Sequence, residues 1–229
     1  MAMAGIGGGG ARRAGRALPM AGENERPERR DAAENRQQIL AAAARLFAAR
    51  GVEAVSMDEI ARAAGVGKGT LYRRYAHKGL LCQALLDGNT RRMQAAVLDG
   101  LRDGRRAALD HLADFLGHLV AHNEENAELL GAVHDAAFGL RRDALYRSAP
   151  YQWQRLMVLG FLRRAVAAGE CPPLDTDVLA DAILAPLAID RYLYQRDALG
   201  LTPGRIVAGV RHLLLEGLRA RERAPGERA

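Results

Sequence analysis

The chain has 229 residues, of which 49% are hydrophobic and 26% charged, and its formal net charge is +6 at pH 7. This composition fits one or two globular domains, and the two cysteines are too few for a disulfide framework or a thiolate zinc site. No stretch approaches the roughly 18 apolar residues of a membrane span, and the N-terminus lacks the apolar segment of a signal peptide, so we expect a cytoplasmic protein.

Most of the net positive charge lies in about a quarter of the chain. Residues 36–88 hold eight Lys and Arg against four Asp and Glu, a net charge of +4, whereas residues 1–35 and 89–229 contribute +1 each. A compact basic region attached to a nearly neutral body indicates a polyanionic partner for that region. On charge alone, a solvated charged face is an equal alternative.

The first predicted elements are a tail and a helix. Residues 1–33 contain almost no large apolar side chains, so we expect them to be disordered. Apolar side chains then recur at helical spacing over residues 35–50 and predict a helix that ends at Gly51. The side chains that make this pattern are Ile39, Leu40, Ala43, Leu46 and Phe47.

The next segment predicts a helix-turn-helix over residues 56–75. Ser56 and Glu59 have the spacing of a capping box, which opens a short helix over residues 57–63. A glycine turn follows, and a third helix is expected over about residues 68–75. Two short helices separated by a tight turn are typical of this DNA-binding unit.

Helical periodicity continues through the rest of the chain, and no alternation typical of strands occurs. Pro186 is expected to kink the penultimate helix. The predicted fold is therefore all-α, with about nine helices. The later helices are expected from His77 to Leu101 and over residues 105–122, 126–138, 149–168, 176–195 and 203–221.

Residues 39–81 read ILAAAARLFAARGVEAVSMDEIARAAGVGKGTLYRRYAHKGLL, and this stretch resembles the DNA-binding domain of the TetR family of bacterial regulators. The resemblance is densest at Gly-Thr-Leu-Tyr, residues 69–72, and at Lys78. It implies a helix-turn-helix DNA-binding domain over residues 34–92, after the tail, and a helical effector-binding and dimerisation domain over residues 93–223.

The resemblance also implies contacts for individual side chains. Thr70 and Arg74 occupy positions that reach base edges, with Lys68 beside them, and arginine suits guanine through bidentate hydrogen bonds. Tyr72 and Lys78 occupy phosphate-contacting positions. The family often has serine at position 67, where this chain has glycine, so that position is left out. The expected DNA-binding residues are Ser56, Lys68, Gly69, Thr70, Tyr72, Arg73, Arg74, His77 and Lys78.

In the body, polar residues recur along one stripe of the fifth predicted helix: His111, Asp114, His118 and His122. They could ligate a metal, line an effector pocket or form a solvated face, and we predict no metal site and no cofactor. The side chains proposed as walls of an effector pocket are Phe115, His118, His122, His134, Phe138, Trp153 and Met157. Ordinary core packing is the alternative for each.

The last two predicted helices carry apolar stripes that suit a four-helix dimer interface. A helix-turn-helix protein of this kind needs two recognition helices about 34 Å apart to read a palindrome. Packing within one chain is the alternative for the same stripes. The residues expected at the dimer interface are Ile183, Leu187, Val207, Val210 and Leu214.

These features predict a transcriptional regulator of the TetR type, a homodimeric repressor released from a palindromic operator by a small-molecule effector, and not an enzyme. The alternative is a small-molecule sensor that binds DNA only non-specifically. Residues 65–70 also resemble part of the phosphate loop of nucleotide kinases, but such a loop needs a preceding strand. The sequence does not indicate the operator, the effector or the regulated genes, nor does it separate repression from activation.

Overall fold

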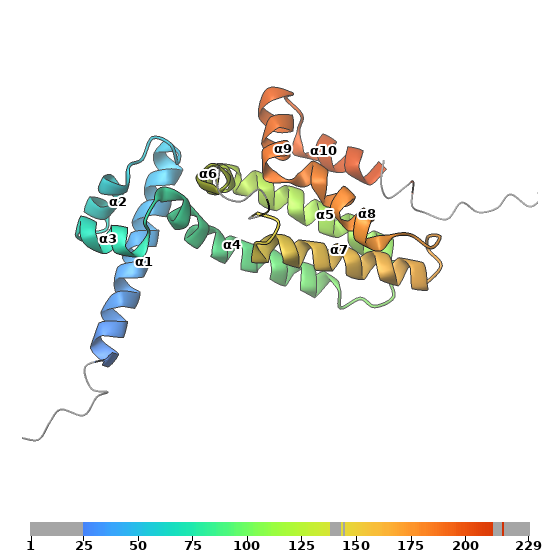
Figure 1. Cartoon of the computed structure of the whole chain (residues 1–229), viewed down its shortest axis with the longest axis horizontal. Coiled ribbons are helices and arrows are strands. Elements are labelled where there is room, and N and C mark those ends of the chain that lie inside the picture. Colours follow the sequence, from blue (N-terminus) through green and yellow to red (C-terminus); the bar gives the residue numbers. More distant parts are fainter. Residues whose placement is uncertain (1–24, 138–142, 144, 213–216, 218–229) are drawn as a thin grey trace, which may run out of the picture. The chain divides into compact units, whose positions relative to one another are not determined.

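The computed structural model describes residues 25–137, 143, 145–212 and 217, and every regular element among them is helical (Figure 1). The chain divides between Gln37 and Gln38 into two compact units. No helix in the described part is long and apolar enough to cross a membrane. The all-α prediction is confirmed for this part of the chain.

The first helix, α1, spans Glu25–Arg50 and so begins ten residues before the predicted start at residue 35. The expectation of a disordered tail is therefore corrected for residues 25–33, while residues 1–24 lie outside the described part. A helix that is already nucleated extends at low cost, because each added residue gains one backbone hydrogen bond. Pro27 is compatible with this extension, because a proline in the first turn loses no intrahelical bond.

The capping box predicted at the start of α2 (Met57–Ala63) is confirmed. The Ser56 hydroxyl accepts the Glu59 N–H at 3.2 Å, and the Glu59 carboxylate accepts the Ser56 N–H at 2.8 Å. Gly65 then takes φ +67°, which favours glycine, and turns the chain into α3 (Lys68–Arg74). The helix-turn-helix is thus set by local hydrogen bonds and one left-handed residue.

The remaining helices pack on one another. Helix α4 packs on α5 and α6, α5 on α7, α7 on α8, and α10 on α5 (Figure 1). Their shared core includes Leu112, Phe115, Leu162 and Ile183, each at most 1% exposed. The bounds are α4 Lys78–Gly100, α5 Ala108–Glu125, α6 Ala127–Ala137, α7 Ala149–Ala167, α8 Thr176–Leu184, α9 Ile189–Leu193 and α10 Pro203–Val210.

The helix predicted over residues 176–195 is broken, as Pro186 led us to expect. A 3₁₀ turn at Ala185–Leu187 separates α8 from α9, and a π-helical turn, η2 (Tyr194–Ala198), follows. The Gln195 side-chain amide donates to the Pro186 carbonyl at 2.9 Å and so satisfies an oxygen near the break. This break divides one predicted helix into two and gives ten α-helices among the described residues.

The start of α5 is capped from a distant part of the chain. Its N-cap, Ala107, offers no side-chain acceptor, but the Glu170 carboxylate accepts the N–H groups of Ala108 at 2.7 Å and Leu109 at 2.9 Å. A carboxylate at a helix N-terminus also interacts favourably with the helix dipole. Glu170 therefore ties the connection after α7 to the start of α5.

Replacing Glu170 with alanine is expected to lower the free energy of unfolding by about 1–3 kcal/mol, because two partly buried N–H groups lose their acceptor. Urea denaturation of both proteins measures the difference. The exposed Asp87 supplies a matched control, since Asp87→Ala should change stability by less than about 0.5 kcal/mol. Equal stability of the Glu170 variant and the native chain would contradict this account of the cap.

Candidate nucleic-acid interface

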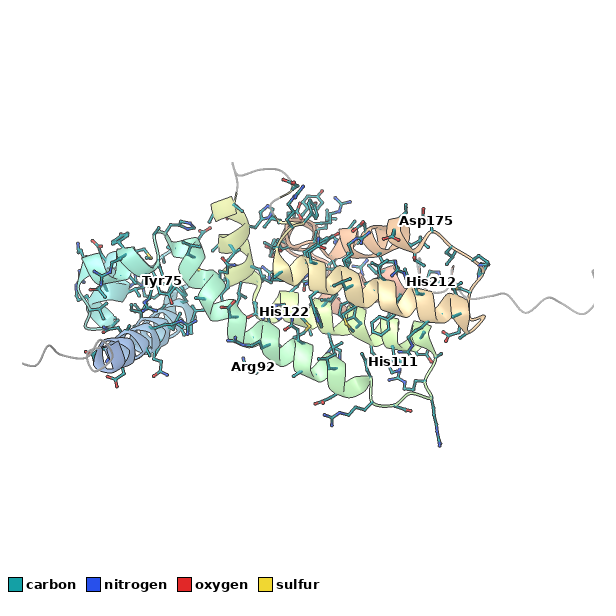
Figure 2. All side chains as sticks on the ribbon, turned by 60° about the horizontal axis from the view of Figure 1, so that its bottom comes forward. Tyr75, Arg92, His111, His122, Asp175 and His212 are labelled. Carbon is teal, nitrogen blue, oxygen red and sulfur yellow. The ribbon has the colours of Figure 1, made fainter. Side chains whose placement is uncertain are left out.

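Helix α3 presents one polar face to solvent and is held from behind by two apolar anchors. Leu71 is fully buried, and Tyr75 at the C-cap is 6% exposed. Figure 2 labels Tyr75 among the helices that surround it. Of the predicted contact residues in this helix, Thr70 is half-buried, and the others are exposed: Lys68, Gly69, Tyr72, Arg73 and Arg74.

Lys68 is engaged within the protein. Its ammonium group forms an ion pair with Asp58 of α2, and both side chains are largely exposed to solvent. Exposed ion pairs contribute only about 0–1 kcal/mol. The pairing therefore holds Lys68 beside α3 and leaves it able to exchange Asp58 for another anion.

The side chains of Lys78 and Ser56 both form hydrogen bonds within the protein. The Lys78 ammonium donates to the carbonyl oxygens of Val52 at 2.7 Å and Glu53 at 3.1 Å. The Ser56 hydroxyl, although exposed, is bound to the Glu59 carboxylate at 2.8 Å. Both residues thus support the local fold. The capping-box spacing predicted this role for Ser56, whereas no sequence pattern predicted it for Lys78.

The loop between α1 and α2 is fixed by a charged network. Arg50 donates to the Glu59 carboxylate at 2.8 Å and to the Ala54 carbonyl at 2.8 Å. The pKa of Glu59 is lowered to about 2, first by the bond from the Ser56 backbone N–H and then by Arg50 and the Ser56 hydroxyl. Glu59 is therefore ionised at neutral pH and holds the end of α1 to the start of α2.

The resemblance to a phosphate loop at residues 65–70 does not extend to the structure. The segment that precedes Gly65 is helix α2, whereas a phosphate loop follows a β-strand. The backbone enters α3 through a helix-turn-helix turn in which the Val66 N–H donates to the Ala61 carbonyl. The geometry therefore favours a DNA-binding unit over a nucleotide site.

Comparisons with known proteins agree with this geometry. Residues 39–85 match the family model of the bacterial regulatory proteins of the tetR family. A curated HTH-type transcriptional regulator of Staphylococcus aureus, strain bovine RF122, is 36% identical over 126 residues, and one of strain USA300 is 33% identical over 124 residues. The segment that holds the helix-turn-helix is thus similar to the tetR family of bacterial regulatory proteins.

The matches to both staphylococcal regulators cover 54% of this chain and 65% of each relative, which is less than two thirds of their length. Solved TetR-family structures extend the likeness in fold. A tetR-family regulatory protein from Rhodococcus RHA1 has a TM-score of 0.59 at 23% identity and covers 82% of this chain and 98% of its own. A gamma-butyrolactone receptor, an ArpA-like protein, has a TM-score of 0.56 at 24% identity, with coverages of 83% and 91%.

In the body of the chain, most of the predicted pocket walls belong to the core. Phe115 is 1% exposed and meets Trp153 edge to face, with ring centroids 5.7 Å apart, and Met157 packs against the same cluster. His122 is also buried. His118 and His134 are half-buried, and Phe138 lies outside the described residues. Phe115 and His122 are thus buried, and Trp153 and Met157 pack against the core, so that their role as walls of an effector pocket stays a prediction.

The histidine stripe of α5 is not a solvated face at its two ends (Figure 2). His111 stacks on Phe161, and its Nε2 lies 3.2 Å from the Asp103 carbonyl oxygen. Burial lowers the pKa of His122, which favours its neutral form, and Asn126 contacts its Nδ1 at 3.3 Å. Among the described residues, no group of His, Cys, Asp or Glu is placed to hold a metal ion.

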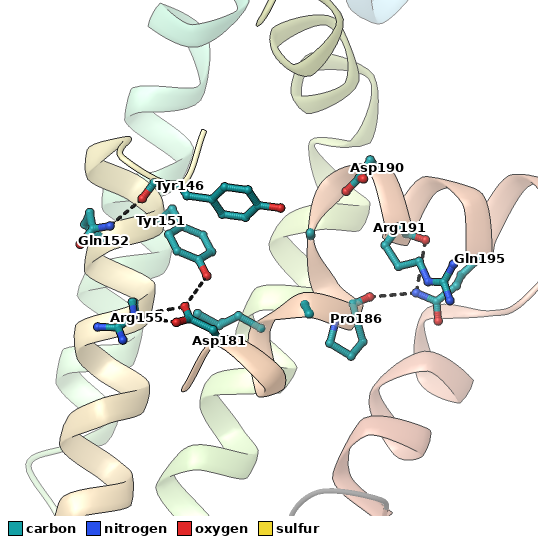
Figure 3. A pocket seen from close by; sticks show the side chains of 12 residues that line it. Tyr146, Tyr151, Gln152, Arg155, Asp181, Pro186, Asp190, Arg191 and Gln195 are labelled. Carbon is teal, nitrogen blue, oxygen red and sulfur yellow. Dashed lines mark hydrogen bonds and ion pairs between the residues drawn. The ribbon is translucent and has the colours of Figure 1, made fainter. Parts of the chain in front are cut away.

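A cavity of about 830 Å³ opens elsewhere, between the start of α7, the end of α8 and α9 (Figure 3). None of the described residues among the predicted walls lines it. The Tyr151 hydroxyl donates to Asp181 at 2.7 Å, and Arg155 donates to Asp181 at 3.1 Å. Burial and the bond to Asp181 raise the pKa of Tyr151. The other lining residues are Tyr146, Gln152, Leu184, Ala185, Pro186, Ala188, Asp190, Arg191 and Gln195.

The predicted dimer residues also belong to the core of a single chain. Ile183, Leu187 and Val210 are 0%, 5% and 7% exposed, and Val207 packs against the same cluster. Leu214 lies outside the described residues. The apolar stripes of α8 and α10 thus pack against α7 and α5, and a contact of these residues with a partner chain stays a prediction.

Proposed function

We propose that this chain is a sequence-specific DNA-binding regulator of transcription that places α3 in the major groove. The observation that carries the proposal is the exposed face of α3, where Tyr72, Arg73 and Arg74 point away from the Leu71 anchor. Arginine side chains on a short, rigid helix suit both guanine edges and phosphates. The family match over residues 39–85 supports the same reading.

The proposal includes a homodimer that reads a palindromic operator. Two apolar side chains outside the core are available for this contact, namely Leu156 of α7 at 65% exposure and Val178 of α8 at 64%. Exposed apolar groups of this size are typical of protein interfaces when they cluster. They are proposed as contacts of the dimer in addition to the residues that the sequence predicts in the last two helices.

The proposal also includes release by a small molecule, with the cavity beside α7, α8 and α9 as the effector site. Its volume of about 830 Å³ falls within the roughly 300–1,000 Å³ of ligand pockets. Tyrosine rings, a proline and hydrogen-bonded polar side chains line it (Figure 3). One structural neighbour is named as a gamma-butyrolactone receptor, which supports reception of a small organic molecule as a property to test here.

Selection of bound duplexes from random DNA by the purified full chain tests this function. A consensus of two inverted half-sites, about 10 base pairs or a multiple apart, is the expected result, because a dimer places two recognition helices one helical turn apart. Retention of DNA without any consensus, falling steeply with salt, would instead favour a sensor that binds DNA only through its positive charge.

A further inference from the structure

The peptide unit on each side of Val52 is held by two charged side chains from different helices. The Glu128 carboxylate accepts the Val52 N–H at 3.0 Å, and the Lys78 ammonium donates to the Val52 carbonyl oxygen at 2.7 Å. Val52 itself is 4% exposed and belongs to the core beneath α2 and α3. We call these three residues the Val52 clamp.

The two charged members of the clamp come from two different helices that follow the helix-turn-helix in the chain. Lys78 is the first residue of α4, directly after the recognition helix, whereas Glu128 lies in the first turn of α6. Val52 lies in the connection between α1 and α2. The clamp therefore joins the segment that enters the helix-turn-helix, the segment that leaves it, and a helix of the body.

Helix α6 is closely fitted against the start of α4. A Cβ atom added to Gly79 would overlap the Ala136 methyl group and lie 3.3 Å from the Ala132 carbonyl oxygen. Glycine is thus required for this approach, and α4 and α6 share the most extensive helix contact among the described residues. Because Glu128 belongs to α6, any shift of α6 along α4 would also move the carboxylate that accepts the Val52 N–H.

Helix α6 also contacts α9, which borders the proposed effector cavity. Helix α6 packs on α9, and a Cβ atom added to Gly131 would lie 3.3 Å from Leu193. Asp190 and Arg191 of α9 line the cavity. Cavity, α9, α6, Glu128 and Val52 thus form one continuous series of packed contacts.

We propose that Glu128 and Lys78 are positioning residues for DNA recognition, which orient α2 and α3 relative to α6 by holding Val52. This inference rests on the proposed function, because positioning has a readout only if α3 binds DNA. In the DNA complex, the Lys78 ammonium then keeps its hydrogen bonds to the Val52 and Glu53 carbonyl oxygens and does not contact a phosphate. A ligand in the cavity that displaces α9 would then act on α3 through this clamp.

Fluorescence anisotropy with the selected consensus duplex, titrated at several salt concentrations, tests the clamp. Glu128→Ala should weaken binding about ten-fold without changing the salt dependence, because a charge-assisted hydrogen bond is lost and no phosphate contact is. Glu128→Gln should restore most of the affinity, since its amide oxygen still accepts the Val52 N–H. Glu125→Ala, at an exposed position near the end of α5, is the matched control and should bind as the native chain does.

Lys78→Ala separates positioning from phosphate contact. The clamp predicts weaker binding with an unchanged salt slope, and non-additive losses in the Glu128→Ala/Lys78→Ala double variant. A salt slope reduced by about one would assign Lys78 to a phosphate and overturn its part of the proposal. Native affinity in Glu128→Ala would overturn the whole inference while leaving the proposed function intact.

Hydrogen exchange at the Val52 amide keeps the test decisive if an alanine variant fails to fold. Glu128→Asp shortens the side chain but keeps its charge, so it should speed exchange of that amide by ten-fold or more in the full chain, whereas Glu128→Gln should protect it. Unchanged exchange in the aspartate variant would overturn the clamp. Absence of any consensus with the native chain would instead remove the proposed function on which the inference rests.

Discussion

Replacing Leu71 with alanine is expected to abolish sequence-specific DNA binding and to lower the free energy of unfolding by about 2–5 kcal/mol. Leu71 is the buried side chain of the seven-residue helix α3 and is 0% exposed. So short a helix is not stable on its own and depends on packing. Urea denaturation measures the loss of stability, and anisotropy with the selected duplex measures the loss of binding.

Arg73→Ala is the matched control for Leu71→Ala, because Arg73 is exposed on the same helix. Its stability should stay within about 0.5 kcal/mol of the native chain, so only contacts to DNA change. If Leu71→Ala instead kept the native sequence preference, α3 would not be the element that reads DNA.

Replacing Phe115 with alanine is expected to lower the free energy of unfolding by about 3–5 kcal/mol, the largest stability effect that we predict. Its ring lies at the centre of the body core, with centroids 5.7 Å from Trp153 and 5.9 Å from Phe161. Alanine leaves a cavity and removes both aromatic contacts. Calorimetry or urea denaturation measures the difference.

Phe115→Leu provides the comparison, since leucine fills much of the same volume and should cost less than the alanine variant. The result also decides between core packing and an effector wall for this residue. A decrease in the free energy of unfolding below about 1 kcal/mol in Phe115→Ala would contradict core packing and favour Phe115 as a wall of an effector pocket.

The DNA-binding end of the chain could be predicted well because its signals are local. A capping box, a glycine with positive φ and a short apolar spacing each act within a few residues, and the structure confirms the elements they predict. Pro186 is a further local signal, since the break between α8 and α9 follows from its missing N–H group. Helix α1 extends further than predicted because propagation needs no apolar pattern.

The body could not be predicted to the same depth, because an apolar stripe on a helix fits packing within one chain as well as packing against a partner. Ile183 and Val210 have the spacing of an interface, yet the structure buries both within one chain. Glu128 and Glu170 act on backbone groups 76 and about 61 residues away in sequence, and no spacing rule links such pairs. The proposed cavity is lined by residues from α7, α8, α9 and the turns around them, so periodicity alone could not find it.

Recognition of base sequence by α3 is tested most directly at Arg74. Selection from random DNA, followed by anisotropy on the selected duplex, is carried out with the native chain and with Arg74→Ala. We expect a palindromic consensus for the native chain, and for Arg74→Ala a relaxed preference at one position of each half-site, worth about 1–3 kcal/mol. An identical consensus in both proteins, or none in the native chain, would contradict recognition of base sequence by α3.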